Sequence, residues 1–243
     1  MEPAAGRDFR KNGSEGDYKM FENRINIFTG HFGSGKTEVA VNYAIQLAKS
    51  GKKTAIVDMD IVNPFFRTAD ARRILEAGGI RVIAPMYANT NVDVPSLPPE
   101  INAMFEDRSY QVVLDVGGDD LGARVLSRYN EQILAEDHIH YFVINTRRPM
   151  TRTVDEIESM IVEIQTSANL KVDKLVNNAN LLGVSSPELL DEASHIIGEV
   201  SERLKIPVGI ISGMGEVLHQ FKGGPGIARL YLEKFIKLPW EQD

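Results

Sequence analysis

Eight residues near the start of the chain, GHFGSGKT at positions 30–37, combine glycines with a lysine and a threonine in a spacing suited to phosphate chemistry. The glycines let backbone N–H groups wrap around phosphate oxygens. Lys36 would reach the β- and γ-phosphates, and the hydroxyl of Thr37 would bind Mg²⁺. The pattern predicts a magnesium–nucleotide site made by Gly30, His31, Phe32, Gly33, Ser34, Gly35, Lys36, Thr37 and Glu38.

Carboxylates follow two later apolar runs. Asp58 and Asp60 come after TAIV, and Asp115 comes after QVVL. In phosphoryl transfer one carboxylate can hold a metal-bound water while another orients the attacking water. We therefore expect catalysis from Lys36, Asp60 and Asp115. We expect Mg²⁺ to be held, directly or through water, by Thr37, Asp58, Asp60 and Asp115. Capping of the strand end is the alternative for Asp58 and Asp60.

Two glycines follow Asp115 directly. Gly117 and Gly118 allow the backbone to approach the γ-phosphate and to move when that phosphate leaves, which is typical of a switch loop. Asp119 and Asp120 come next, and we interpret them as caps of the following helix. The glycine pair is therefore assigned to the nucleotide site, and the two acids are not.

Asn177 and Asn178 end a further apolar run, and arginines end another. An asparagine amide can both donate to and accept from a base edge. Because the Asn-Lys-x-Asp pattern of guanine sites is absent, adenine is favoured, with ATP or ADP and Mg²⁺ as the bound cofactors. A turn stabilised by the asparagines is the alternative. Arg147 and Arg148 would face phosphate, a partner or solvent.

These residues need a fold that brings strand ends together. Short apolar runs alternate with helical stretches and occur at Ile25–Phe28, Thr54–Val57, Val82–Ala84, Gln111–Leu114, His140–Ile144, Lys174–Val176 and Val208–Ile211. The pattern predicts an α/β fold of three layers, in which a mostly parallel sheet lies between helices and the ligand lies beyond the carboxyl ends of the strands.

The domain organisation is expected to be simple. Residues 1–18 have the composition of a flexible tail, and residues 19–243 form one nucleotide-binding domain. Residues 85–107, rich in proline and asparagine, predict a surface excursion with one short helix, either a solvated connection or a contact with partners.

Composition narrows the functional classes. A net charge of -7 gives no reason to expect nucleic acid as a partner. The chain contains no cysteine, so its own residues supply no disulfide, thiolate nucleophile or thiolate metal ligand. No apolar run approaches the length of a membrane span, and we expect a cytoplasmic location.

The C-terminal stretch GIARLYLEKFIKLPWEQD is expected to form an amphipathic helix. Its apolar side would contain Ile227, Leu230, Tyr231, Phe235 and Leu238. Packing on the sheet is the favoured interpretation, and contact with a membrane surface is the less favoured alternative.

With the loop, DMDIVNP, LDVGGDD and LVNNAN in this order, the chain resembles the MinD/ParA-like P-loop ATPases, within the broader CobQ/CobB/MinD/ParA group. The resemblance covers residues 25–238. It implies that Lys36 and Thr37 bind phosphate and Mg²⁺, that Asp60 orients water, and that Asp115 is the Walker B acid. It also implies that Asn177 reads adenine.

The chain departs from that family in its loop. The family's loop reads Lys-Gly-Gly-x-Gly-Lys-Thr, and its first lysine crosses a dimer interface to the partner's phosphates. Here His31 and Phe32 replace the first two of these residues. Since imidazole is mostly uncharged at neutral pH, hydrolysis is expected to be slow unless a cation substitutes, the candidates being Arg67, Arg147 and Arg148.

Two functions fit these motifs. The first is an ATP-dependent switch that acts through a homodimer or an unidentified protein partner. The second is an enzyme similar to dethiobiotin synthetase or the cobyrinic acid amidating enzymes, in which ATP activates a small carboxylate. Residues 85–107 with Arg147 and Arg148 would then form the substrate pocket.

Overall fold

Strands and helices alternate along the computed structural model, which describes residues 20–60, 68–85, 98–118, 120–180, 185–221, 223–224 and 226–236. The predicted tail at 1–18, Arg67, Asp119, Leu238 and most of the excursion at 85–107 lie outside these ranges. In chain order the elements are β1 (Ile25–Thr29), α2 (Lys36–Lys49), β2 (Thr54–Asp58), η2 (Thr68–Ala71), α3 (Arg72–Ala77), β3 (Arg81–Ile83), α4 (Glu100–Glu106), β4 (Gln111–Asp115), α5 (Asp120–Ser127), α6 (Asn130–Leu134), β5 (His138–Ile144), α7 (Val154–Ala168), β6 (Lys174–Asn177), α8 (Pro187–Leu204), β7 (Val208–Met214), α9 (Gly215–Gln220) and β8 (Ala228–Leu232).

The strands form one sheet in the order β3-β2-β4-β1-β5-β6-β7-β8, and the pairings between the described strands are all parallel. Parallel pairing places the carboxyl ends of all the strands on the same side of the sheet, at the ends of the strands. In the register of β2 and β4, Asp58 lies beside Asp115, and Asp115 is also the partner of Phe28 at the end of β1. The predicted phosphate loop and both carboxylate motifs therefore meet at the carboxyl ends of these strands.

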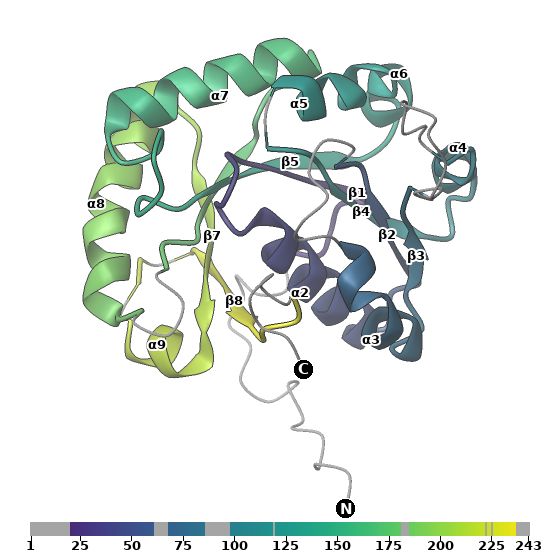
Figure 1. The fold of residues 1–243 in the computed structure, drawn as a ribbon, viewed down its shortest axis with the longest axis horizontal. Coiled ribbons are helices and arrows are strands. Elements are labelled where there is room, and N and C mark those ends of the chain that lie inside the picture. Colours follow the sequence, from purple (N-terminus) through teal and green to yellow (C-terminus); the bar gives the residue numbers. More distant parts are fainter. Residues whose placement is uncertain are drawn as a thin grey trace, which may run out of the picture.

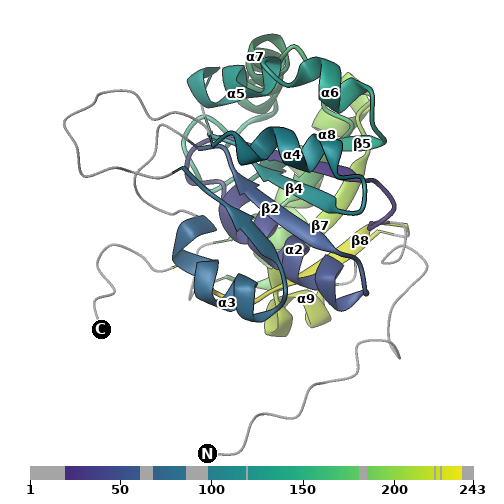
Figure 2. The same cartoon turned by 90° about the vertical axis from the view of Figure 1, so that its right-hand side faces the viewer.

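Helices cover both faces of the sheet, which confirms the predicted three-layer α/β fold (Figure 1). Alternation along each strand divides the apolar side chains between two cores. Ile27 and Val57 pack with α4, α5, α7 and α8, whereas Phe28 and Ile56 pack with α2 and α3. Figure 2 shows α2 and α3 on one side of the strands and α4, α5 and α7 on the other.

The seven expected strands are all present, with ends that differ by up to three residues. The short helix expected in the excursion is also present, at Glu100–Glu106. Within the described ranges, no helix is both long and apolar enough to cross a membrane.

The expected C-terminal helix is wrong for residues 228–232, which form strand β8 at the sheet edge beside β7. Ala228, Leu230 and Leu232 are buried while Arg229 and Tyr231 are half-buried. This burial has a period of two residues, as a strand requires, and the helical spacing of Ile227, Leu230 and Tyr231 was coincidental. A membrane-binding helix is therefore excluded for residues 228–232.

Helix α2 holds the segment that follows β8. The Glu38 carboxylate accepts hydrogen bonds from the backbone N–H groups of Phe235 at 2.8 Å and Ile236 at 3.1 Å. One turn later, the Asn42 amide donates to the carbonyl of Glu233 at 2.9 Å and accepts from its N–H at 2.8 Å. The side chain of Glu38 is thus engaged by this segment, and its contact with nucleotide stays a prediction.

A neutral histidine is built into β5. His140 is fully buried, with Nε2 at 2.8 Å from the Thr29 hydroxyl and Nδ1 at 3.0 Å from the Lys171 carbonyl. The neutral ring meets both partners, donating from Nδ1 and accepting at Nε2. Burial lowers the pKa of His140 to about 4. An unfolded histidine binds a proton below about pH 6.5, so the folded state loses stability between that pH and about 4.

We expect replacement of His140 by glutamine to remove this acid sensitivity. The difference in unfolding free energy between the original protein and H140Q should shrink by about 2 kcal/mol from pH 7.5 to pH 5, since 1.5 pH units at 1.36 kcal/mol each are involved. Urea unfolding of both proteins at the two pH values measures it. A difference that stays constant with pH would show that His140 does not titrate in this way.

Candidate nucleotide site

The phosphate loop joins β1 to α2, and its glycines are required by the backbone path. A Cβ on Gly30 would lie 2.4 Å from the carbonyl oxygen of Val143 in the neighbouring strand. Gly33 and Gly35 have φ angles of 79° and 82°, in the left-handed region that favours glycine. Gly35 is the N-cap of α2, so the helix begins directly at Lys36. The loop therefore ends at a helix N-terminus, where anions are stabilised.

Lys36 is paired with a carboxylate inside the site. Its Nζ lies 3.2 Å from Oδ2 of Asp60, and the two residues are only 6% and 5% exposed. Burial alone would lower the pKa of Lys36, but the charges of Asp115 and Asp60 outweigh it and raise the pKa. The ammonium therefore stays charged at neutral pH.

Asp58 and Asp115 lie side by side at the ends of β2 and β4. Burial raises the pKa of Asp58 to about 7, and the neighbouring charge of Asp115 adds to the shift. Asp58 also accepts a hydrogen bond from the N–H of Asp60 at 3.0 Å. Burial raises the pKa of Asp115 as well, while Lys36 opposes the shift. Three buried carboxylates thus share one nearby ammonium.

Asp115 has the surroundings of a metal-binding carboxylate. Its Oδ2 accepts from the Thr68 hydroxyl at 3.0 Å, and the nearby Thr37 side chain helps to restrain the rise of its pKa. Among the described atoms, its buried Oδ1 has no hydrogen-bond partner. Thr37 and Asp115 therefore fit Mg²⁺, which would neutralise phosphate charge when bound. Within the described ranges, no three His, Asp or Glu side chains form a metal site by themselves.

Replacing Asp58 by asparagine is expected to stabilise the nucleotide-free protein at pH 8. The amide oxygen still accepts from Asp60, while one buried charge beside Asp115 is removed. Because the folded-state pKa of Asp58, about 7, lies above its unfolded value of about 3.8, the acid costs stability that accumulates as pH rises from about 4 to about 7. We expect a gain on the order of 2 kcal/mol at pH 8, seen as a rise in Tm of several degrees.

The same comparison at pH 5 is the control for D58N. At pH 5 only about a third of the interval between the unfolded and folded pKa values of Asp58 has been passed, so the gain in Tm should be less than half of that at pH 8. A lower Tm of D58N at pH 8 would contradict the charge assignment.

Gly117 lies against Asp60, and Gly118 lies against the phosphate loop. A Cβ on Gly117 would lie 3.3 Å from Oδ1 of Asp60, and one on Gly118 would lie 2.8 Å from the N atom of Phe32 and 2.9 Å from the carbonyl of Gly30. Side chains larger than hydrogen would push these segments apart. The end of β4 is therefore in backbone contact with the phosphate loop.

The two asparagines predicted to read adenine point in different directions. The Asn177 amide donates to the Leu190 carbonyl at 3.3 Å and to the Ser194 hydroxyl at 3.0 Å, both on α8. The Asn178 amide instead donates to the Ser34 carbonyl in the phosphate loop at 2.7 Å. Both side chains are buried. Base recognition by either residue stays a prediction.

The two residues that depart from the family's loop, His31 at the lysine position and Phe32 at the first glycine, are exposed to different degrees. His31 is half-buried, while Phe32 is 55% exposed. Of the candidate cations, Arg148 donates from Nε to the Gly33 carbonyl at 3.1 Å, and Arg147 pairs with Glu192. Arg148 is therefore the candidate that contacts the phosphate loop in the described part of the chain.

The sequence interpretation missed two hydroxyls. Thr68 bonds to Asp115, and Ser212 at the end of β7 bonds to Asn178 at 2.9 Å. Thr68 follows Asp60 by eight residues without a recognisable motif. Ser212 had one usable signal, since it extends the predicted apolar run Val208–Ile211 toward the ligand edge.

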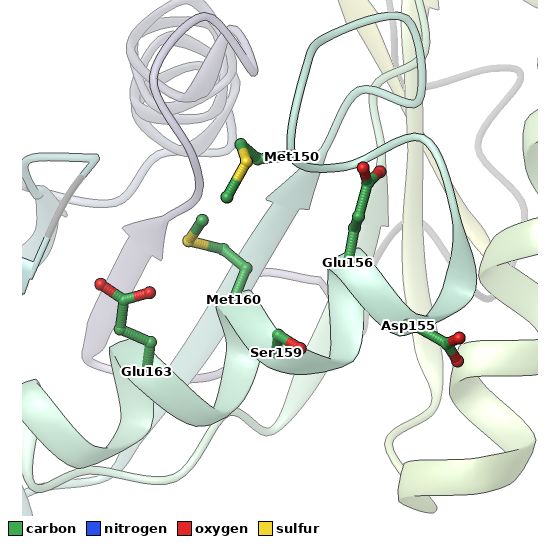
Figure 3. Close-up of a pocket in the computed structure, with 6 residues that line it drawn as sticks. All are labelled: Met150, Asp155, Glu156, Ser159, Met160 and Glu163. Atoms are coloured by element: carbon green, nitrogen blue, oxygen red, sulfur yellow. The ribbon is translucent and has the colours of Figure 1, made fainter.

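A separate hollow of about 270 Å³ lies along the first half of α7 (Figure 3). Its lining combines apolar and acidic side chains, with Met150 and Met160 pointing toward one another. The lining residues are Met150, Asp155, Glu156, Ser159, Met160 and Glu163. None of the residues predicted to bind nucleotide is among them, and the chemistry described above lies elsewhere.

Known structures share this fold. FtsY, a cell division protein from Thermotoga maritima, is 18% identical with a TM-score of 0.53, and the match covers 78% of this chain and 61% of that one. Chloroplast FtsY from Physcomitrella patens is 14% identical with a TM-score of 0.52, covering 78% and 58%. The chain thus spans about three fifths of the length of these FtsY chains. At this identity they support the fold alone.

Among curated proteins, the chain has no match. A family model does match residues 20–113, and its description is ParA: NUBPL iron-transfer P-loop NTPase. This region contains the phosphate loop, the carboxylates that end β2 and strand β4 up to Val113. Over residues 20–113 the chain is therefore similar to this family of P-loop NTPases, and its parallel sheet has the fold that such proteins share.

Proposed function

We propose that the protein is a magnesium-dependent ATPase that acts as a switch, in which ATP binding changes the strand-end loops and thereby its association with a second copy or a protein partner. The family supports nucleotide binding and NTP hydrolysis in general. The proposal adds ATP as the nucleotide, Mg²⁺ as the metal, and switching as the use of the cycle.

The buried ion pair between Lys36 and Asp60 is the observation that carries this proposal. In a phosphate loop the lysine ammonium binds the β- and γ-phosphates. The Lys36 ammonium lies 3.2 Å from the Asp60 carboxylate. A bound γ-phosphate would compete with that carboxylate for the same ammonium. Binding of ATP and the position of Asp60 are therefore coupled.

The contacts of the glycine pair extend this coupling. Gly117 packs against Asp60, and Gly118 packs against the backbone of Phe32 and Gly30. A shift of Asp60 or of the loop would move the end of β4, because packed backbones cannot interpenetrate. In the proposed cycle Asp60 orients the attacking water, while Thr37 and Asp115 hold Mg²⁺.

Slow turnover is part of the proposal. His31 stands where the family has a permanent cation, and a histidine is mostly neutral at pH 7. Arg148 contacts the carbonyl of Gly33 and is our candidate for the substituting cation. Such a cation would stabilise the charge of the transferring phosphoryl group.

Iron transfer, which the name of the family model mentions, is not part of the proposal. Iron–sulfur clusters are usually held by cysteine thiolates. This sequence contains no cysteine, so its own residues supply no such ligand.

Activation of a small carboxylate by ATP is the second candidate. It needs a substrate pocket, for which we considered residues 85–107 with Arg147 and Arg148. Arg147 is paired with Glu192 and Arg148 with the phosphate loop, so both side chains already have partners. We therefore rank this function below the switch.

Release of ADP and sedimentation velocity test the two candidates together. The switch predicts basal ADP release that small carboxylic acids do not change, and sedimentation or partner capture that differs between Mg–ATPγS and Mg–ADP. Strict dependence of ADP release on one small acid would reject the switch in favour of the second candidate. The variant K36M is the negative control for both readouts.

A further inference from the structure

Two side chains hold the phosphate loop by consecutive carbonyl groups. The Asn178 amide donates to the Ser34 carbonyl at 2.7 Å, and Arg148 Nε donates to the Gly33 carbonyl at 3.1 Å. Asn178 follows β6 directly, and the Arg148 loop follows β5. Two strand ends thus contact the loop from outside its own chain segment.

The Asn178 amide is fixed in one orientation. Its Oδ1 accepts from the Ser212 hydroxyl at 2.9 Å, and both residues are 1% exposed. The reverse orientation would place Oδ1 against the Ser34 carbonyl, so that two acceptors would face each other in a buried site. Ser212 in β7 and Ser34 in the loop together direct the NH₂ group toward the loop.

This contact sets the direction of a backbone donor. In a trans peptide, the carbonyl oxygen and the N–H of the next residue point in opposite directions. Holding the Ser34 oxygen against Asn178 therefore directs the Gly35 N–H to the other side. Gly35 immediately precedes Lys36 at the start of α2, and a Cβ on Gly35 would lie 2.4 Å from Asn178 Nδ2. The amide is in close contact with the loop at its phosphate-binding end.

We propose that Asn178 is a positioning residue of the phosphate loop, supported by Ser212, and that it does not read the nucleotide base. Its amide hydrogen bond keeps the Ser34–Gly35 peptide in the orientation that presents N–H to phosphate. This inference rests on the proposed function only in assuming that the loop binds nucleotide phosphates.

Binding of a ligand without a base separates the two roles. Isothermal titration with Mg–ATP, Mg–GTP and Mg–tripolyphosphate would be carried out on the original protein, N178A and S212A. Removal of the amide should weaken all three ligands by the same factor, about tenfold, because one peptide orientation is lost for all of them. S212A should give a smaller loss with the same pattern, since Asn178 remains.

The control is S194A, which removes a hydroxyl partner of Asn177 on α8 and leaves the loop contacts intact. Its affinities should match those of the original protein, even where its Tm falls. Unchanged tripolyphosphate binding in N178A, or an altered ratio of ATP to GTP affinity, would overturn the positioning role. If N178A does not fold, the same two outcomes in S212A decide. Failure of the original protein to bind any of the three ligands would instead contradict the proposed function.

Discussion

Replacement of Lys36 by methionine is expected to abolish measurable nucleotide binding and to lower the free energy of unfolding at pH 8 by about 3 kcal/mol. The ammonium contacts Asp60 at 3.2 Å, and its charge opposes the rise that burial causes in the pKa of Asp58 and Asp115. Without it, three buried carboxylates repel one another. The free energy should be measured by urea unfolding, and the affinity by titration with Mg–ATP.

The loss of stability in K36M should diminish as the pH falls. Removing the cation raises the pKa of Asp58 and Asp115 further, so these two carboxylates take up protons in acid and the repulsion diminishes. At pH 5 the deficit should be less than half of that at pH 8. K49M is the matched control, since Lys49 is exposed at the other end of α2. A deficit that is independent of pH would contradict the electrostatic origin.

Replacement of Asp60 by asparagine is expected to separate binding from turnover. The amide cannot compete with phosphate as strongly for the Lys36 ammonium, so the affinity for Mg–ATP should be unchanged or higher. Turnover should fall roughly a hundredfold or more, because the carboxylate that orients the attacking water is gone. Kd and kcat measured on the same preparation show both effects.

D191N is the control for D60N, since Asp191 is an exposed acid on the surface of α8. It should leave both Kd and kcat at their original values. If turnover of D60N stays within about threefold of the original, Asp60 has no part in hydrolysis.

The architecture was accessible from the sequence because strands buried on both faces are nearly continuous apolar runs. Ile25–Thr29 and Thr54–Asp58 are buried throughout, and both were predicted to within one residue. Strand β8 was missed because it lies at the sheet edge and alternates buried with half-buried positions. In so short a segment, many of the same apolar residues fit both the two-residue period of a strand and the spacing of a helix, so the sequence does not distinguish them.

The residues of the candidate site that directly follow strands could be predicted from the sequence. Asp58, Asp60 and Asp115 lie together because parallel strands end at one edge. The pairing of Lys36 with Asp60 depends on side-chain geometry that no spacing encodes. The opposite directions of Asn177 and Asn178 follow the alternation of a strand, yet which of the two faces the phosphate loop is determined by the neighbouring α8 and β7.

The central claim is that binding of ATP at Lys36 changes the ends of β2 and β4. Amide hydrogen exchange measures this directly in the original protein saturated with Mg–ATPγS or with Mg–ADP. We predict slower exchange around Asp60 and Gly117–Gly118 with ATPγS than with ADP, because the γ-phosphate competes for Lys36. Equal protection at these positions by two nucleotides that both bind would contradict the account.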